Sequence, residues 1–388
     1  MRSAVVVDVV RTPSGKGKLG GALADVHPVD LLATTLAALV ERQRLDPALV
    51  DDVIVGCVGQ AGQQALNIGR QGVLAAGWPD SVPATTVDRQ CGSSQQAVHF
   101  AAQGVIAGAY DVVVAAGVES MSRVPMFSAV RGEDPYGPGI ARRFPEGLLH
   151  QGVCADLVAE KWGMGRADLD AFAARSHRLA AETAASGGFA DELVAVGDVD
   201  ADETIRATTT PEALAGLRPA FASDEMRARH PGMDWRITPG NSSPLTDGAA
   251  AALVMGEDVA ERLGLRPRAR FVSFAVAGDD PALMLTAPIP ATHKALSKAG
   301  LGIGDVDAYE VNEAFASVPL AWQAEVGADP DRLNPRGGAI ALGHPLGASG
   351  TRLLATLVNH LEATDGRYGL QTMCEAGGLA NATIIERV

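Results

Sequence analysis

The sequence has few aromatic residues and few cysteines. Only 4% of its 388 residues are Phe, Trp or Tyr, whereas 47% are hydrophobic and 20% are charged. This composition, without any low-complexity tract, is typical of a soluble globular α/β protein and excludes a disordered or fibrous chain. A chain of this length is expected to form about two or three domains, each with ample apolar surface to bury.

The cysteines lack the spacing of a metal site. The sequence contains no CxxC, no HExxH and no paired Cys/His motif, so we expect no structural zinc, no iron–sulfur cluster and no other bound metal. So few cysteines, in a chain without a signal-peptide pattern, predict free thiols in a reducing, cytoplasmic environment. Four residues could each be either a small buried hydrophobe or a nucleophile: Cys57, Cys91, Cys154 and Cys374.

Long apolar runs and an excess of positive charge are also missing. The segment AVVVDVV at residues 4–10 is interrupted by Asp8, and no segment reaches the roughly 18 apolar residues of a membrane span. We therefore expect no membrane partner. The net charge of -14 argues against nucleic acid as a partner, although a few local cations could hold a small anionic ligand.

The N-terminal part alternates between strand and helix patterns. Apolar residues at helical spacing, such as Leu32, Leu36 and Leu39, predict one of the helices. The alternation is typical of βαβ units around a mostly parallel sheet. We expect strands at residues 4–9, 51–58 and 111–117, and helices at 29–44, at 67–76 and directly after Cys91.

A similar order returns near the C-terminus. VDAYEVNEAF at residues 306–315 leads through a glycine-rich loop to the helical TRLLATLVNHL and then to the strand LQTMC, so the two ends look like a diverged duplication. Residues 118–243 between them are richer in proline, glycine and charge. We interpret them as an insertion with its own small helical body, serving as a lid or ligand platform.

Cys91 follows VDRQ and precedes GSSQQAV, at the expected entry to a helix. Backbone N–H groups at a helix N-terminus can lower the pKa of a thiol and can stabilise a developing oxyanion. The residues alone support two interpretations equally. Cys91 is either a nucleophile or a buried cysteine at a strand–helix joint.

His344 lies in the glycine-rich loop NPRGGAIALGHPLGASG at residues 334–350. The loop contains neither GxxxxGK[ST] nor GxGxxG, which argues against a phosphate cradle. It holds His344 between Gly343 and Pro345, in a fixed direction that suits a general base or a hydrogen-bond donor to an oxyanion. Ordinary polar packing is the simpler interpretation of the other histidines, which are His27, His99, His150, His177, His230, His293 and His360.

Cys374 and Asn312 each end a predicted strand of the second half. Because the same ends of parallel strands meet at one edge of a sheet, we expect both to face one crevice with Cys91 and His344. The amide of Asn312 could hold a water molecule there.

Four blocks of the sequence resemble the signature blocks of the thiolase family, in the family's order. They are RQCGSSQQA around Cys91, NEAFA at residues 312–316, GGAIALGHPLGASG at 337–350, and the segment around Cys374. Three further blocks agree: GVESMSRVPM at 117–126, LRPAF at 217–221 and GNSSPLTDGAAA at 240–251. The resemblance spans nearly the whole chain.

This resemblance implies the thiolase fold, in which two similar βαβαβ-type halves stack as α-β-α-β-α layers. Residues 1–117 with 244–268 are then the N-terminal half, and 269–388 are the C-terminal half. Residues 118–243 are the inserted loop domain, which provides coenzyme A (CoA) binding and oligomer contacts. Because family members are dimers or tetramers, the resemblance also implies a homodimer or homotetramer.

The resemblance implies catalytic roles as well. Cys91 is the acylated nucleophile, His344 takes its proton, and Cys374 is the acid/base at the α-carbon of the acetyl-CoA fragment. His344 and a water held by Asn312 stabilise the enolate, while the N–H groups of Cys91 and Ala376 hold the tetrahedral oxyanion. The family usually has glycine where Ala376 stands. If that position requires a positive φ, alanine is strained by about 1 kcal/mol.

CoA is implied as a co-substrate, with no permanently bound cofactor. Arg206 matches a position near the nucleotide end of CoA, and His150 and Ser243 match positions beside its pantetheine arm. The matches to the adenine and pantetheine lining are Leu217, Ala220 and Phe221, and the matches to the acyl pocket are Met284 and Phe315. Each of these positions is also compatible with ordinary packing.

The motifs ESMSRVPM and RQCGSSQQA resemble degradative thiolases more than biosynthetic ones. The expected reaction is the cleavage of a 3-oxoacyl-CoA by CoA to acyl-CoA and acetyl-CoA, in the β-oxidation of fatty, branched or steroid side-chain acyl groups. One alternative is a biosynthetic acetyl-CoA acetyltransferase that forms acetoacetyl-CoA. Another is a non-catalytic thiolase-like protein that binds acyl-CoA or sterol, which the joint presence of Cys91, His344 and Cys374 opposes.

Overall fold

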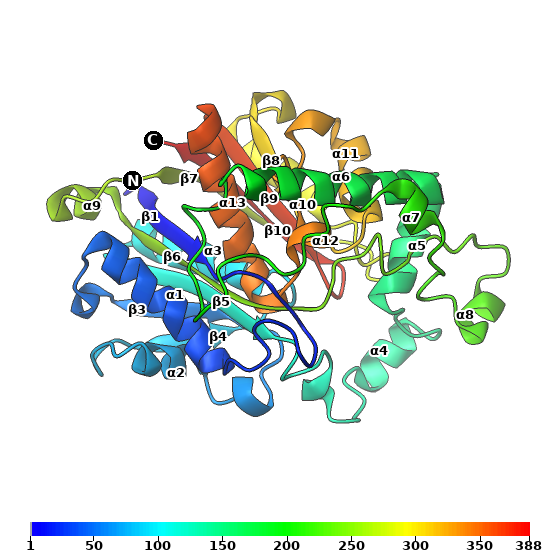
Figure 1. Cartoon of the computed structure of the whole chain (residues 1–388), viewed down its shortest axis with the longest axis horizontal. Helices are drawn as coiled ribbons and strands as arrows, with labels where there is room; N and C mark the ends of the chain where they lie inside the picture. Colours follow the sequence, from blue (N-terminus) through cyan, green and yellow to red (C-terminus); the bar gives the residue numbers. More distant parts are fainter. Residues whose placement is uncertain (1) are drawn as a thin grey trace.

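One mixed β-sheet of ten strands runs through the protein, in a computed structural model that describes residues 2–388 (Figure 1). The strand order is β4-β3-β5-β6-β1-β7-β10-β9-β8, and β2 pairs with β6. The strands are β1 (Ala4–Arg11), β2 (Gly15–Lys16), β3 (Asp52–Gly56), β4 (Ala84–Val87), β5 (Val112–Ser120), β6 (Thr246–Gly256), β7 (Ala269–Gly278), β8 (Ala308–Val311), β9 (Tyr368–Glu375) and β10 (Leu379–Arg387).

The prediction of a mostly parallel sheet is wrong. Among the described strands, β3 is parallel to β4 and β5, and β8 is parallel to β9, whereas the remaining pairings are antiparallel. The sequence pattern could not show this, because a strand buried on both faces is a continuous apolar run whichever way it points. β6 is such a strand, since every one of its residues is buried.

The two halves of the sheet repeat one topology, as the predicted duplication requires. β3, β5, β6 and β1 of the first half correspond to β8, β9, β10 and β7 of the second, with matching parallel and antiparallel pairs. The halves join where Val5 and Val6 of β1 lie opposite Arg270 and Ala269 of β7. No named strand of the second half corresponds to β4; its place beside β8 is taken by a single parallel bridge between Tyr309 and Leu333.

The principal helices complete a five-layer stack around the two halves (Figure 1). α3 (Ser93–Ala107) and α13 (Ser349–Thr364) pack against each other in the middle layer, where α3 contacts β3 and β5 and α13 contacts β8 and β9. α1 (Pro28–Gln43) covers the outer face of the first half, and α10 (Pro288–Ala299) covers that of the second. Because α13 lies between the two halves of the sheet, it is buried on nearly every side.

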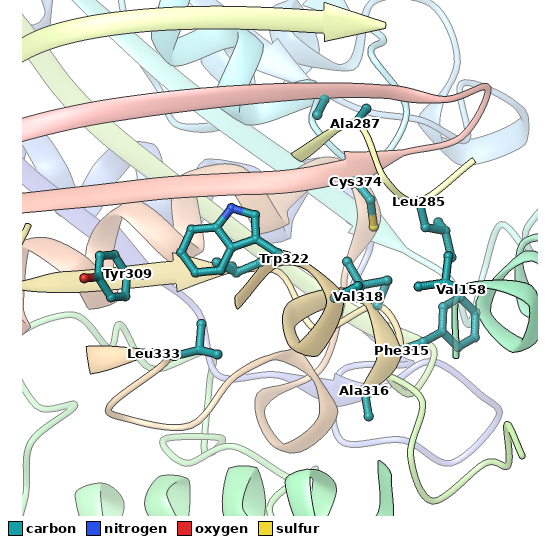
Figure 2. Packing of buried hydrophobic residues seen from close by; sticks show 14 of the residues in the cluster. Val158, Leu285, Ala287, Tyr309, Phe315, Ala316, Val318, Trp322, Leu333 and Cys374 are labelled. Carbon is teal, nitrogen blue, oxygen red and sulfur yellow. The ribbon is translucent and has the colours of Figure 1, made fainter. Parts of the chain in front are cut away.

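The core of the second half extends to the candidate site. Figure 2 shows this core with Tyr309 and Trp322 at one end, Phe315 and Leu285 at the other, and the sulfur of Cys374 pointing into it from β9. The Trp322 indole is fully buried, and its Nε1–H donates to Oγ1 of Thr292 at 2.8 Å. The apolar packing that holds the second half together therefore also positions Cys374.

The segment between β5 and β6 carries its own helices, as expected. α5 (Gln151–Lys161) packs on α11 (Ser317–Val326), and α6 (Arg166–Ala185) packs on α12 (Ala339–Leu342), so the segment is held against the second half. The remaining helices are α2 (Ile68–Ala75), α4 (Gly137–Arg143), α7 (Pro211–Ala215), α8 (Asp224–Arg229) and α9 (Glu257–Leu263). Within residues 2–388, none of the helices combines the length and apolarity that a membrane crossing needs.

Candidate active site

Two cavities meet at Cys91. The larger has a volume of about 460 Å³ and the smaller a volume of about 370 Å³. Both are within the size range of small-molecule sites. Residues from five separate stretches of chain line both cavities: Cys91, Met121, Met126, His150, Gln151, Leu346 and Ala376.

Cys91 lies at the joint between β4 and α3, where Gln90 has a left-handed backbone with φ of 48° and Gly92 is the N-cap residue. The expected lowering of its pKa is wrong. Burial and, secondly, the carboxyl group of Glu375 raise the pKa of the Cys91 thiol to about 12. Because Cys91 precedes the N-cap and is only 8% exposed, desolvation outweighs the helix N-terminus. The resting cysteine is therefore a thiol that needs a base.

His344 is fixed in one tautomer by its neighbours. Its Nδ1 lies 2.6 Å from Oγ of Ser349, and this hydroxyl donates its own proton to the carbonyl of Pro345 at 2.9 Å. The hydroxyl can therefore only accept from His344, so Nδ1 carries the proton and Nε2 is the unprotonated nitrogen. Burial, and secondly the positive charge of Arg352, lower the pKa of His344 to about 3. The neutral ring thus presents Nε2 as a base.

The loop around His344 needs glycine before the histidine. Gly343 has φ of 82°, and a Cβ atom there would lie 2.5 Å from Oγ1 of Thr246. The same hydroxyl accepts from the backbone N–H of His344 at 3.1 Å. The close approach of the loop to β6 therefore sets the direction of the imidazole.

Asn312 follows β8 and contacts His344, with its Nδ2 3.4 Å from Nε2. The side chain is fully buried, and its Oδ1 has no hydrogen-bond partner in the described structure. It lies behind the cavity wall, since it is not among the residues that line either cavity. The orphaned oxygen is available to a water molecule or to a ligand group.

Cys374 and Ala376 bring the end of β9 to the larger cavity, which Cys91 and His344 also line. Burial raises the pKa of Cys374 well above its usual range, and the neighbouring Cys91 adds to the effect. The strain considered for Ala376 is absent, because the left-handed residues of this turn are Gly377, with φ of 88°, and Gly378, with φ of 77°. The two glycines that follow Ala376 therefore adopt the positive φ values that this turn requires, and Ala376 does not.

The residues matched to CoA positions divide between the cavity and its surroundings. The larger cavity is lined by Arg206, Ala220, Phe221, Ser243 and His150. The rings of His150 and Phe221 stack, with centroids 5.2 Å apart. Leu217 lines neither cavity; it is 38% exposed and packs against Gly240.

The two residues matched to the acyl pocket lie in different cavities. Met284 lines the smaller one and Phe315 lines the larger one. Gln90, Phe127 and Met284 all line the smaller cavity and all have positive φ, between 48° and 69°. Left-handed backbone is uncommon in bulky residues and tends to occur at functional sites.

Sequence reasoning missed two polar residues that hold the site together. Ser349 orients His344, and it stands in the same glycine-rich block, so its hydroxyl was a signal that could have been used. Glu119, at the end of β5, accepts from the backbone N–H groups of Val58, Gly59 and Gly347 at 2.9 to 3.0 Å. It thereby joins the loop after β3 to the loop after His344. No local pattern marks it.

Comparison with known proteins places the chain in a family. Residues 4–258 match the model of the N-terminal domain of thiolases, and residues 265–387 match that of the C-terminal domain. The chain is 46% identical over 400 residues to a steroid 3-ketoacyl-CoA thiolase of Mycobacterium tuberculosis, with 100% of this chain and 95% of that protein covered. It is 44% identical over 401 residues to a 3-ketoacyl-CoA thiolase of Escherichia coli, with both chains covered in full.

The fold agrees with this relationship. A crystal structure of the acetyl-CoA acetyltransferase of Bacillus anthracis matches with a TM-score of 0.89 at 36% sequence identity, covering 100% of this chain and 99% of that one. The predicted resemblance and the predicted fold class are therefore confirmed. The chain belongs to the thiolase family.

Proposed function

We propose that the protein is a degradative acetyl-CoA C-acyltransferase, which cleaves a 3-oxoacyl-CoA with CoA to a shortened acyl-CoA and acetyl-CoA. The observation that carries this proposal is the meeting of two cavities at Cys91, with His344 and Cys374 lining one of them. A thiolase needs one space for the CoA arm and another for the acyl group, on either side of its nucleophile. The names of the relatives from M. tuberculosis and E. coli support the same reaction.

In the first half-reaction, Nε2 of His344 takes the proton of the Cys91 thiol while the sulfur attacks the 3-keto carbon. The bond between C2 and C3 then breaks, and its electron pair goes to C2 of the departing acetyl-CoA enolate. Cys374 donates its thiol proton to C2. Acetyl-CoA leaves, and the acyl group remains on Cys91 as a thioester.

In the second half-reaction, the Cys374 thiolate takes the proton of an incoming CoA thiol. The CoA sulfur attacks the thioester, acyl-CoA leaves, and Cys91 recovers its proton from His344. Because burial raises the pKa values of both cysteines, each sulfur is a thiol at rest, so Cys91 needs a proton acceptor before it can attack, and the Cys374 thiolate is a strong base once formed.

Two sites would stabilise negative oxygen. His344, with a water held behind it on the unpartnered Oδ1 of Asn312, would stabilise the enolate, and the backbone N–H groups of Cys91 and Ala376 would stabilise the tetrahedral intermediate. The unstrained backbone of Ala376 supports its part, since the turn needs no glycine at that position.

The larger cavity would bind CoA and the smaller one the acyl group. Arg206 offers a cation to the phosphates of CoA, whereas His150, Phe221 and Ser243 lie along the pantetheine arm. Leu217 would have no direct contact with CoA, because it lines neither cavity. The smaller cavity carries an apolar wall that suits a fatty, branched or steroid side-chain acyl group: Val58, Met121, Val124, Met126, Phe127, Val130 and Met284.

Neither of the two alternative functions accounts for all the features of the candidate site. A synthase of acetoacetyl-CoA needs room for little more than an acetyl group, although the B. anthracis acetyl-CoA acetyltransferase shares the fold. A non-catalytic acyl-CoA binder needs neither the oriented His344 base nor a second cysteine beside Cys91.

The proposal includes a homodimer or homotetramer in the cytoplasm, with no nucleic acid or membrane partner and no bound metal. β4 supports self-association, because within residues 2–388 it pairs with β3 alone and leaves an edge open to another copy. The four cysteines, all free, suit a reducing compartment. We also propose the domain division given by the family: 1–117 with 244–268, 118–243, and 269–388.

Thiolysis of short, medium, long and steroid side-chain 3-oxoacyl-CoAs tests the reaction. We expect turnover that rises from acetoacetyl-CoA to the longer or bulkier substrates, and a wild-type acyl adduct on the Cys91 peptide in mass spectra. Cys91→Ser should abolish that adduct. Binding of all substrates without turnover would instead favour the non-catalytic alternative.

A further inference from the structure

Glu375 is a buried acid beside the candidate nucleophile that the proposed mechanism does not use. It is the last residue of β9, directly after Cys374, and it is fully buried. Its side chain extends to the other candidate cysteine, because Oε1 packs so closely on Gly92 that a methyl group there would overlap it. Gly92 immediately follows Cys91. The carboxyl group therefore packs against the backbone of the nucleophile loop, by which we mean residues 88–92 between β4 and α3.

The carboxyl group has no hydrogen-bond partner for either oxygen in the described structure. The side chain of Asn381 on β10 also approaches Gly92: its Nδ2 donates to the carbonyl of Gly92 at 3.2 Å, and its Oδ1 is also unpartnered. The backbone N–H of Asn381 is near enough to favour the ionised form but makes no hydrogen bond with either oxygen, so an ionised carboxylate here lacks the donors that normally stabilise it. A neutral acid would be a better fit, because its O–H could donate to an orphaned acceptor such as Oδ1 of Asn381.

The groups around Glu375 shift the pKa of its carboxyl group in opposite directions. The nucleophile loop contributes Arg89, Asp88 and Cys91, and β9 contributes Cys374 on the strand's other face. Asn381 from β10 is uncharged. On α3, burial and, secondly, Arg89 lower the pKa of His99 to about 3, so this helix adds no positive charge. Burial raises the pKa of Glu375 to about 8, while Arg89 and, less strongly, the backbone N–H of Asn381 oppose the rise.

We propose that Glu375 is a positioning residue whose neutral acid form permits Cys91 to act as a nucleophile and whose ionised form suppresses it. The carboxyl group acts through Gly92 and through its field at Cys91, and it touches neither substrate nor CoA. On the alkaline side of the Glu375 titration, the negative charge of the carboxylate raises the pKa of the Cys91 thiol, so less Cys91 thiolate forms than would form beside a neutral acid. This inference rests on the assignment of Cys91 as the nucleophile in the proposed function.

The test measures how fast iodoacetamide alkylates Cys91 between pH 6 and pH 10, by quantifying the Cys91 peptide in mass spectra. The assay needs no turnover, so it is independent of whether the protein cleaves 3-oxoacyl-CoAs. E375Q keeps the shape of the side chain and fixes it as neutral. We expect E375Q and the wild type to react equally at pH 6.5, and E375Q to react about tenfold faster at pH 9.5, as one pKa unit at the thiol gives.

The matched control is E310Q, which removes another fully buried carboxyl group whose pKa burial raises to about 8, on β8 and facing Arg352. Its alkylation profile should coincide with that of the wild type. A second readout needs no variant. The wild-type plot of log rate against pH should show a shoulder where Glu375 ionises, followed by a rise parallel to the first.

An E375Q/wild-type ratio that is constant across the pH range, or a wild-type plot without a shoulder, would overturn the inference and leave Glu375 a packing residue. The acyl adduct on Cys91 is scored separately. If the alkylation results are as expected and no acyl adduct forms from any substrate, the proposed function fails while the charge control of Cys91 stands.

Discussion

The hydroxyl of Ser349 lies 2.6 Å from Nδ1 of His344 and, because its own proton is donated to Pro345, it receives the imidazole proton. This contact decides which nitrogen of His344 can act as a base. The contact joins the first turn of α13 to the loop that precedes this helix. A helix of the middle layer therefore determines which nitrogen of His344 is protonated.

Ser349→Ala should lower kcat for thiolysis by roughly 10- to 100-fold, because the hydrogen bond that fixes the tautomer and later stabilises the imidazolium is lost. KM should change much less, since Ser349 lines neither cavity. Steady-state kinetics at saturating CoA checks both values. Thr364→Ala is the control, because that exposed hydroxyl on the same helix donates only to His360. Equal losses in kcat for the two variants would contradict the role of Ser349.

Ala129→Trp should narrow the smaller cavity at its rim. Ala129 lines that cavity and is exposed, so the larger side chain can be accommodated without unfolding the protein. We expect the ratio of kcat/KM for a long or steroid side-chain substrate to that for acetoacetyl-CoA to fall by roughly tenfold or more. Ala141→Trp, an exposed position on α4 that lines neither cavity, should keep the wild-type ratio. An unchanged ratio in Ala129→Trp would place the acyl group elsewhere.

Asp156→Asn should stabilise the protein at alkaline pH. Oδ1 of Asp156 accepts from the N–H groups of Arg236 and Ile237 at 2.7 and 3.0 Å, and Oδ2 has no partner. Burial raises the pKa of this group to about 6. The folded state therefore holds the proton more tightly than the unfolded chain, whose Asp has a pKa of about 3.9, so stability is lost as pH rises from about 4 to about 6.

The amide keeps the Oδ1 acceptor without the charge. Thermal unfolding should show a higher Tm for Asp156→Asn than for the wild type at pH 8, equivalent to about 1–3 kcal/mol, and similar Tm values near pH 4. The exposed Asp134→Asn is the comparison and should leave Tm unchanged at both pH values. A lower Tm for Asp156→Asn at pH 8 would show that the ionised form is the better fit.

Gly92→Ala should destabilise the protein by about 1–3 kcal/mol, because the added methyl group overlaps Oε1 of Glu375. The double variant with Glu375→Ala should recover part of that loss, since the overlapping group is removed. Gly139→Ala, where a Cβ atom meets nothing within 4 Å, is the matched control. Additive losses in the double variant would mean that the two residues do not press on each other.

The sequence predicted which residues form the candidate site more accurately than it predicted the sheet that holds them together. Cys91, His344 and Cys374 are marked by glycine, proline and polar neighbours, which are local signals, and all three line one cavity. The antiparallel pairing of β5 with β6 depends on contacts between residues that are far apart in the chain, and an apolar run carries no direction. β5 also continues through Glu119 and Ser120, beyond the predicted end at 117, because the Glu119 carboxylate accepts from the N–H of Val58 and the Ser120 backbone N–H donates to Oε1 of Gln64.

The electrostatics of the site were the least predictable part. Position at a helix entry suggested a low pKa for Cys91, but burial and the approach of Glu375 have the larger effect. Glu375 follows Cys374 in the sequence and packs on Gly92, which is remote in sequence, so no local pattern could reveal the contact. Likewise, Leu217 matches a binding position in sequence yet packs outside both cavities, because its side chain turns toward Gly240.

The two edge strands of the sheet differ in how accessible they are for pairing with another copy of the chain. At the β8 end, residues 333–334 close the edge: Tyr309 bridges to Leu333, and the side chain of Asn334 bonds the backbone of Val311 in both directions. At the other end, β4 pairs only with β3 among the described strands; Asn67 donates to the carbonyl of Ala84, and α2 packs against the strand. A sheet with two open ends can grow into a fibre, whereas a sheet with one open end can join a single twofold-related copy and then has no edge left. If copies of the chain pair through β4, the closed β8 end therefore stops strand-by-strand growth at that pair.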